Sequence, residues 1–192
     1  MNADDLTLAD PDMRFSAADL KGLVRTVPDF PAKGILFGDV TKLIGNGAGF
    51  AAAVAHLAER AEAAGAQAIA GIEARGFIFG AAVAARLGLP FIPVRKPGKL
   101  PVPVLAIDYA LEYGTDTLEV DPGAVTGGQT VVLIDDLIAT GGTALAAAGL
   151  LRRAGGHVAL ALFVIDLPDL GGANRLREAG LAATTLIDFP GD

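Results

Sequence analysis

The feature that most constrains the fold is a series of short apolar runs without polar alternation, several of them separated by Ala-rich segments. The separating segments, such as GFAAAVAHLAERAEAAG, carry apolar residues at helical spacing. The runs themselves have the length of strands: QAIAGI, LPFIPV, TVVLID, HVALALFVI and LAATTLI. A strand that is apolar on both faces needs cover on both faces, as in a parallel sheet with crossover helices. The sequence therefore predicts an α/β fold in which helices flank a parallel sheet.

Two segments do not follow this order of strands and helices. Residues 1–45 carry several prolines and glycines around a few apolar anchors, and we expect them to form a cap over the active edge of the sheet. Residues 96–115 begin with KPGKLPVPV and are too long for an ordinary connection, so we expect an irregular, flexible lid loop. A strand is expected just after it, at TDTLEV. With 192 residues the chain has room for one well-buried core, which predicts a single domain over residues 1–192.

The composition narrows the class of partner. The formal net charge is −7, whereas a sequence-independent grip on nucleic acid or on an anionic membrane needs a basic surface. There is no cysteine for a disulfide or a metal cluster, and the first twenty residues hold no apolar leader segment. We expect a cytoplasmic protein that binds neither nucleic acid nor membranes.

The stretch TVVLIDDLIATGGTA, residues 130–144, combines two neighbouring carboxylates with a Gly-rich turn. In an open α/β sheet, ligands bind beyond the carboxyl ends of the strands. The turn offers backbone N–H groups, the hydroxyls of Thr140 and Thr143, and the start of a helix, all of which favour an anion such as phosphate. Neither a Walker A loop nor a G-x-G-x-x-G string is present.

Asp135 and Asp136 would oppose an anion in that turn. Two unit charges about 8 Å apart at an effective dielectric of about 20 repel by roughly 2 kcal/mol, and each donor to a charged group returns about 1.5–3 kcal/mol. Sugar hydroxyls or a hard divalent cation would occupy the carboxylates and remove the conflict. A ribose 5-phosphate satisfies both halves of the motif. The alternative is that Asp136 caps the next element and the glycines only turn the chain.

Arg75, Arg95, Lys96 and Lys99 lie close together in the sequence, although the chain as a whole is acidic. This grouping indicates a small anion pocket, and a solvated basic loop is the alternative.

The strand, two acids and Thr-Gly-Gly-Thr turn resemble the signature of the phosphoribosyltransferase family. Four further segments, PDFPAKGILFGDVT, GIEARGFIFG, PVRKPGKLP and YALEYGTDTLEV, resemble its adenine-using members, and the likeness runs from about residue 26 to residue 190. It implies a type I phosphoribosyltransferase-like sheet with an N-terminal hood. It also implies transfer of ribose 5-phosphate from phosphoribosyl pyrophosphate to N9 of adenine, giving AMP and pyrophosphate, with Mg²⁺ as cofactor, in a homodimer.

The resemblance assigns roles to positions of this sequence. Asp135 and Asp136 are expected to hold the ribose 2′- and 3′-hydroxyls. The 5′-phosphate is expected on the turn: Ala139, Thr140, Gly141, Gly142 and Thr143. Pyrophosphate is expected on the cations: Arg75, Arg95, Lys96 and Lys99.

Three further expectations follow from the same resemblance. Glu112 corresponds to the acid–base residue at the purine, with Tyr113 beside it, and together with Arg75 and Lys99 it is expected to be catalytic. Leu36 and Phe37 are expected to hold adenine. No direct metal site is implied, because Mg²⁺ would be held mainly by substrate and water, with Asp135 as the candidate protein ligand. The peptide bond between Glu73 and Ala74 is expected to be cis.

One position departs from the family pattern. The phenylalanine of the cap motif is usually followed by arginine, and here Gly38 follows it. We still expect adenine as the substrate. The alternatives are the same reaction on another purine, such as hypoxanthine or xanthine, and a non-catalytic sensor of phosphoribosyl pyrophosphate.

Overall fold

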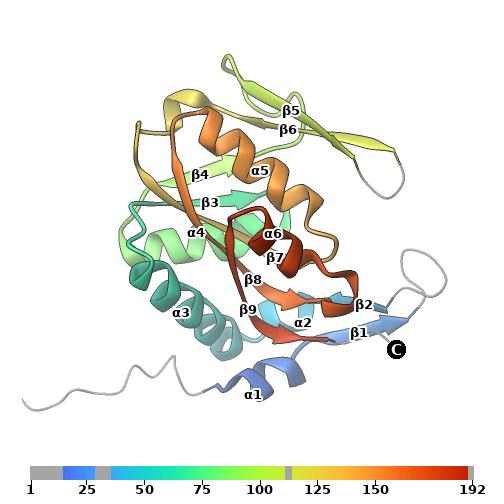
Figure 1. The fold of residues 1–192 in the computed structure, drawn as a ribbon. Coiled ribbons are helices and arrows are strands. Elements are labelled where there is room, and N and C mark those ends of the chain that lie inside the picture. The colour runs from blue at the N-terminus through green and yellow to red at the C-terminus, as the bar shows by residue number, and fades with distance from the viewer. Residues whose placement is uncertain (1–14, 29–35, 111–113, 190–192) are drawn as a thin grey trace, which may run out of the picture.

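The computed structural model describes residues 15–28, 36–110 and 114–189 and contains one five-stranded parallel sheet (Figure 1). Its strand order is β4-β3-β7-β8-β9. The bounds are β3 Ala68–Ile72, β4 Phe91–Val94, β7 Thr130–Ile138, β8 His157–Asp166 and β9 Ala182–Asp188. All five strands were predicted from their apolar runs, and the parallel α/β sheet is confirmed.

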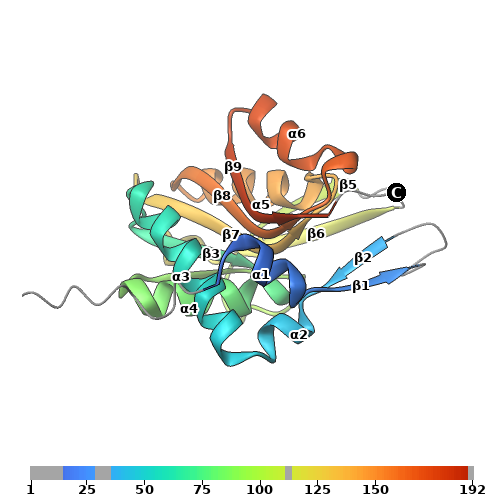
Figure 2. The ribbon, with the colours of Figure 1, turned by 90° about the horizontal axis from the view of Figure 1, so that it is seen from below.

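Helices cover both faces of the sheet. The helices α3, Gly47–Ala63, and α4, Arg75–Leu87, lie on one face, and α5, Gly142–Arg153, lies on the other (Figures 1 and 2). Alternate residues of one strand join different cores: Ile69 packs with α3 and α4, whereas Ala68 packs in the core under α5. This two-sided burial explains why the strands show no polar alternation.

An antiparallel hairpin lies over α5, formed by β5, Leu105–Ala110, and β6, Thr115–Val120. The strand at β6 was predicted, but the expectation of irregular chain throughout residues 96–115 is wrong for β5. Its apolar residues alternate, and Leu105, Ile107 and Tyr109 pack against the core on the α5 side. The prolines that suggested an irregular loop all precede residue 105. A lid function for this segment stays a prediction.

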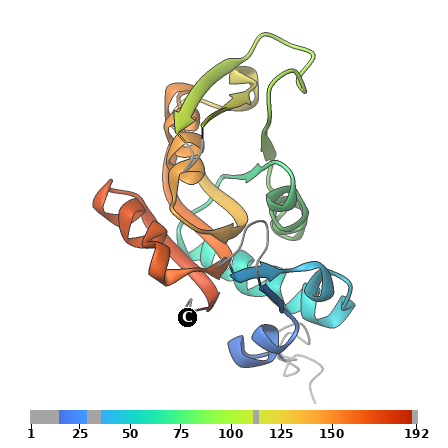
Figure 3. The same cartoon turned by 90° about the vertical axis from the view of Figure 1, so that its right-hand side faces the viewer.

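The N-terminal part is built from short elements: α1 Ala17–Gly22, β1 Arg25–Pro28, β2 Leu36–Asp39 and α2 Thr41–Ile44. The strands β1 and β2 form an antiparallel hairpin. Gly38 of β2 is buried, and a Cβ on it would lie 3.0 Å from Cδ1 of Ile165 near the end of β8. Figure 3 looks onto that side of the molecule, with β5–β6 toward the top and β1–β2 toward the bottom. This position is compatible with the expected cap.

The segment after β8 forms the last helix. A short 3₁₀ turn at Pro168–Leu170 leads into α6, Gly172–Glu178, and a second 3₁₀ turn lies at Pro122–Ala124. Leu176 of α6 is fully buried in the core on the α5 side. Within the described ranges, no helix combines the length and apolar character that crossing a membrane requires.

Candidate active site

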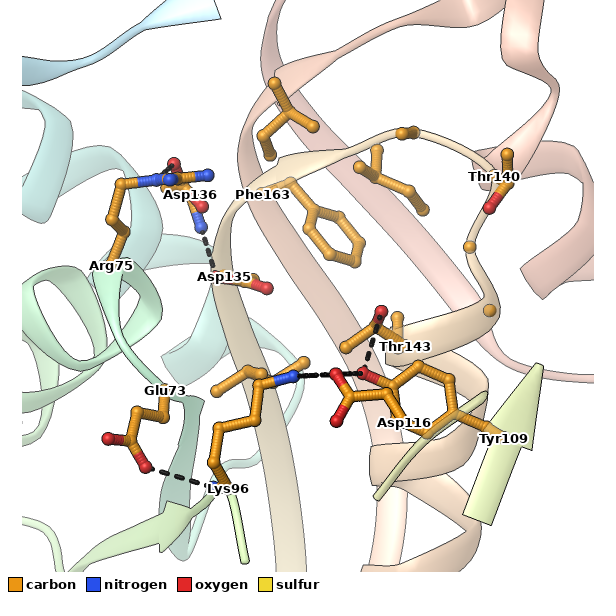
Figure 4. Close-up of a pocket in the computed structure, with 17 residues that line it drawn as sticks. Glu73, Arg75, Lys96, Tyr109, Asp116, Asp135, Asp136, Thr140, Thr143 and Phe163 are labelled. Atoms are coloured by element: carbon orange, nitrogen blue, oxygen red, sulfur yellow. Dashed lines mark hydrogen bonds and ion pairs between the residues drawn. The ribbon is translucent and has the colours of Figure 1, made fainter. Parts of the chain in front are cut away.

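A cavity of about 290 Å³ lies where β3 and β7 end and α5 begins (Figure 4). Such crevices are the usual ligand sites of open α/β sheets. Nine of the predicted site residues line it: Arg75, Lys96, Asp135, Asp136, Ala139, Thr140, Gly141, Gly142 and Thr143. The cavity therefore brings the acid pair, the glycine turn and two of the predicted cations together.

The two neighbouring aspartates, Asp135 and Asp136, have different interaction partners. Consecutive residues of a strand point to opposite faces, so Asp135 and Asp136 separate at the end of β7. Asp136 is only 3% exposed and forms an ion pair with Nε of Arg75 at the start of α4. Asp135 accepts a hydrogen bond from the backbone N–H of Asp136 at 2.9 Å. Burial, and then the charge of Asp136, raise the pKa of the Asp135 carboxyl well above its usual range.

Residues 139–143, which we call the glycine loop, comprise the turn after β7 and the first two residues of α5. Gly141 has a φ of 80° and precedes the first residue of α5, a conformation that glycine adopts without strain. The first backbone N–H groups of a helix have no partner within the helix, and its dipole favours an anion there. A Cβ on Gly142 would lie 3.4 Å from the carbonyl oxygen of Ala110, so β5 closes over the loop from one side.

The four predicted cations do not share one position. Arg75 and Lys96 line the cavity, whereas Arg95 and Lys99 are not among its lining residues. Arg95 forms an ion pair with both oxygens of Glu73, at 3.1 and 3.2 Å, and donates to the carbonyl of Lys99 at 3.1 Å. Its hydrogen bond lowers the pKa of the Glu73 carboxyl. The peptide bond between Glu73 and Ala74 is cis, as predicted.

Tyr109 and Asp116 line the cavity but were not predicted. Lys96 Nζ forms an ion pair with Asp116 and donates to the Tyr109 hydroxyl at 3.4 Å, and Tyr109 donates to Asp116 at 3.2 Å (Figure 4). The hydroxyl of Thr143 in the glycine loop donates to Tyr109 at 3.5 Å. The Lys96 hydrogen bond lowers the pKa of the Asp116 carboxyl. The apolar alternation of LAIDYA is the signal that could have placed Tyr109 on the α5 side.

The purine side of the predicted site is only partly described. Glu112 and Tyr113 lie outside the described residues. The backbones of Leu36 and Phe37 belong to β2, where Phe37 pairs with Val27 of β1, and their side chains also lie outside the description. The roles expected for these residues stay predictions.

The oxygen atoms that line the cavity could supply some, but not all, of the ligands of a hard cation such as Mg²⁺. Among the described residues, no group of three or more His, Cys, Asp or Glu side chains could bind a metal by itself. Mg²⁺ typically uses one or two carboxylates and takes its other ligands from water and substrate phosphates. Asp135 is a carboxylate in the cavity wall, so the residues present are compatible with a cation held in this way.

The chain is similar to proteins of one family along most of its length. The model of the phosphoribosyl transferase domain matches residues 41–175. An adenine phosphoribosyltransferase of Novosphingobium aromaticivorans is 72% identical over 90% of this chain and 97% of its own, and one of Erythrobacter litoralis is 65% identical over the same shares. The crystal structure of adenine phosphoribosyltransferase from Thermoanaerobacter pseudethanolicus has a TM-score of 0.86 at 45% identity, covering 91% of this chain and 100% of that one.

A second solved structure is the adenine phosphoribosyltransferase from Saccharomyces cerevisiae, in complex with an imino-altritol bisphosphate and adenine. It has a TM-score of 0.83 at 36% identity and covers 88% of this chain and 97% of its own. The architecture of the sheet and the arrangement of the helices agree with these structures. The chain belongs to the adenine phosphoribosyltransferase family of transferases.

Proposed function

We propose that this chain transfers ribose 5-phosphate from phosphoribosyl pyrophosphate to N9 of adenine and releases AMP and pyrophosphate. One observation carries the proposal. A single cavity contains two carboxylates that can accept hydrogen bonds from hydroxyls, Asp135 and Asp136, and a helix start suited to an anion at the glycine loop. A sugar 5-phosphate carries both kinds of complementary group, hydroxyls that donate to carboxylates and a terminal anion. The names of the relatives, one of which is 72% identical over 90% of this chain, support the same reaction.

We assign the substrate groups as follows. Asp135 and Asp136 receive hydrogen bonds from the ribose hydroxyls, and the glycine loop binds the 5′-phosphate through its amide groups. Arg75 and Lys96 contact the pyrophosphate from the cavity wall. Arg95 and Lys99 are assigned to it as well, Arg95 after its pair with Glu73 opens. Leu36 and Phe37 hold adenine, and Glu112 handles the purine proton.

The chemistry needs little covalent help from the protein. Displacement of pyrophosphate at the anomeric carbon passes through a cation-like sugar, so orientation and charge stabilisation lower the barrier. The chain's residues hold the ring by its hydroxyls and phosphate, leaving the anomeric carbon open to N9 of adenine, and they exclude water that would otherwise hydrolyse the sugar. Mg²⁺, when bound, would neutralise charge on the departing pyrophosphate.

We also propose that the protein uses Mg²⁺, works as a homodimer and is cytoplasmic. The Mg²⁺ proposal is supported by the partial oxygen site at Asp135 and by the chemistry of a pyrophosphate leaving group. The homodimer is proposed from the family resemblance, and its mass in solution would test it. The absence of cysteine agrees with a reducing compartment.

A pyrophosphate-release assay with adenine, hypoxanthine, guanine and xanthine tests the proposal. We expect adenine to be used with the highest kcat/KM. A tenfold preference for another purine would refute the adenine assignment, and binding of phosphoribosyl pyrophosphate without turnover of any purine would indicate the sensor.

The role of Glu112 has its own test. Glu112→Leu should lower kcat far more than it weakens phosphoribosyl pyrophosphate binding, because the carboxylate is assigned to the purine proton. Equal losses in both would mean that the residue only positions its segment.

A further inference from the structure

The start of α6 lies against the back of the glycine loop, backbone to backbone. A Cβ built on Gly172 would lie 2.2 Å from the carbonyl oxygen of Ala139 and 2.8 Å from the backbone nitrogen of Gly141. In the other direction, a Cβ on Gly141 would lie 2.9 Å from the carbonyl oxygen of Gly172. The two backbones are therefore in van der Waals contact, which only glycine at both positions permits.

Arg175, one turn further along α6, donates from its guanidinium to the carbonyl oxygen of Thr140 at 3.4 Å. The carbonyl of Gly141 accepts the backbone N–H of Leu145 inside α5 at 3.0 Å. The carbonyls of Ala139 and Thr140 thus face α6, and that of Gly141 faces into α5, so none of the three faces the cavity.

The orientation of these carbonyls determines where the loop's donors point. In a planar trans peptide the N–H group points opposite to the C=O group. With the carbonyls of Ala139 and Thr140 turned toward α6, the N–H groups of Thr140 and Gly141 are directed away from it. A carbonyl turned into the cavity would instead repel a bound phosphate.

We propose that Gly172 and Arg175 are positioning residues that hold the glycine loop with its amide groups presented to the 5′-phosphate of the sugar substrate. Neither residue lines the cavity, so both act through the loop. The inference rests on the proposed function only in taking a sugar 5′-phosphate as the ligand of the loop.

Gly172→Ala tests the close contact, because the new methyl group would meet backbone atoms that cannot rotate away. Gly47→Ala is its matched control: Gly47 is also the first residue of a helix, α3, and a Cβ there meets nothing within 4 Å. Arg175→Met removes the bond to the Thr140 carbonyl. Arg177→Met is its control on the same helix, since Arg177 donates to Ala183, away from the loop, at 3.0 Å.

The readout is the dissociation constant of ribose 5-phosphate, measured by calorimetry, beside those of pyrophosphate and adenine. We expect Gly172→Ala to weaken ribose 5-phosphate binding about tenfold to a hundredfold, the scale of losing one hydrogen bond to a charged phosphate. Arg175→Met should weaken it about threefold to tenfold. Pyrophosphate and adenine binding should stay unchanged in both variants, and both controls should match the wild type in all three. A general loss of stability would not separate the three ligands in this way.

Wild-type affinity for ribose 5-phosphate in both test variants would overturn the inference, even if the wild type turns over adenine. If Gly172→Ala does not fold, the Arg175→Met result decides in the same terms. If the wild type binds ribose 5-phosphate but converts no purine, the proposed function fails and the positioning role stands. No binding of ribose 5-phosphate by the wild type would overturn the positioning role, whereas the proposed function would still be decided by the pyrophosphate-release assay.

Discussion

Replacing Arg75 with methionine should leave the carboxylate of Asp136 buried without the counter-charge that the arginine supplies. The Asp136 side chain is 4% exposed and the Arg75 side chain 49% exposed. Breaking a fully buried pair costs about 3–5 kcal/mol, whereas an exposed pair contributes about 0–1 kcal/mol. With one partner half in water, we expect a loss of about 2–3 kcal/mol, or roughly 4–12 °C in Tm for a chain of this length.

A double-mutant cycle separates charge from packing. Asp136→Asn in the Arg75→Met background removes the uncompensated charge and should restore most of the loss, which gives a coupling energy of about 2 kcal/mol. The assay is chemical and thermal unfolding of the four proteins at one protein concentration and neutral pH, without ligand. Arg25→Met is the matched control, because its pair with Asp39 at 2.5 Å involves an arginine side chain that is 66% exposed. A loss below about 1 kcal/mol for Arg75→Met, or no recovery in the double variant, would refute this reasoning.

Two further predictions concern charges at the cavity. Because the pKa of Asp135 is raised in the folded protein, its contribution to stability is complete below the unfolded pKa and is lost as the pH rises through the folded value. Asp135→Asn should therefore gain stability relative to the wild type as the pH is raised from about 4 to about 8 without ligand; a difference in Tm that stays constant with pH would contradict this. Asp116→Asn removes the carboxylate that pairs with Lys96, whose side chain is 37% exposed, so the effect on Tm should be small. It should strengthen pyrophosphate binding about threefold at low salt and less at high salt, measured by calorimetry; unchanged or weaker binding at low salt would count against a competition between Asp116 and the ligand for Lys96.

Much of the fold could be predicted because its strands are buried on both faces. The runs at TVVLID and HVALALFVI carry the same apolar signal in the sequence that the two cores show in the structure. The strand β5 was missed because the Pro-rich run before it dominated the interpretation, although Leu105, Ile107 and Tyr109 alternate along it. Local composition identified an unusual segment but not where it becomes regular.

The candidate site could be predicted where its residues are contiguous in sequence. Asp135, Asp136 and the glycine loop belong to one strand, turn and helix, so their proximity follows from the local chain. Which cation faces the cavity depends on pairings between distant segments: Glu73 engages Arg95, and Asp116 engages Lys96. The contact between Gly172 and the glycine loop likewise involves segments far apart in the sequence, one after β8 and one after β7. No sequence pattern predicts it.

The most direct test of the account is a crystal structure of the protein with phosphoribosyl pyrophosphate bound. We expect the ribose hydroxyls to donate to Asp135 and Asp136 while the 5′-phosphate accepts hydrogen bonds from the amide groups of residues 139–143. A complex in which the phosphate lies elsewhere, or in which both carboxylates turn away from the sugar, would contradict it.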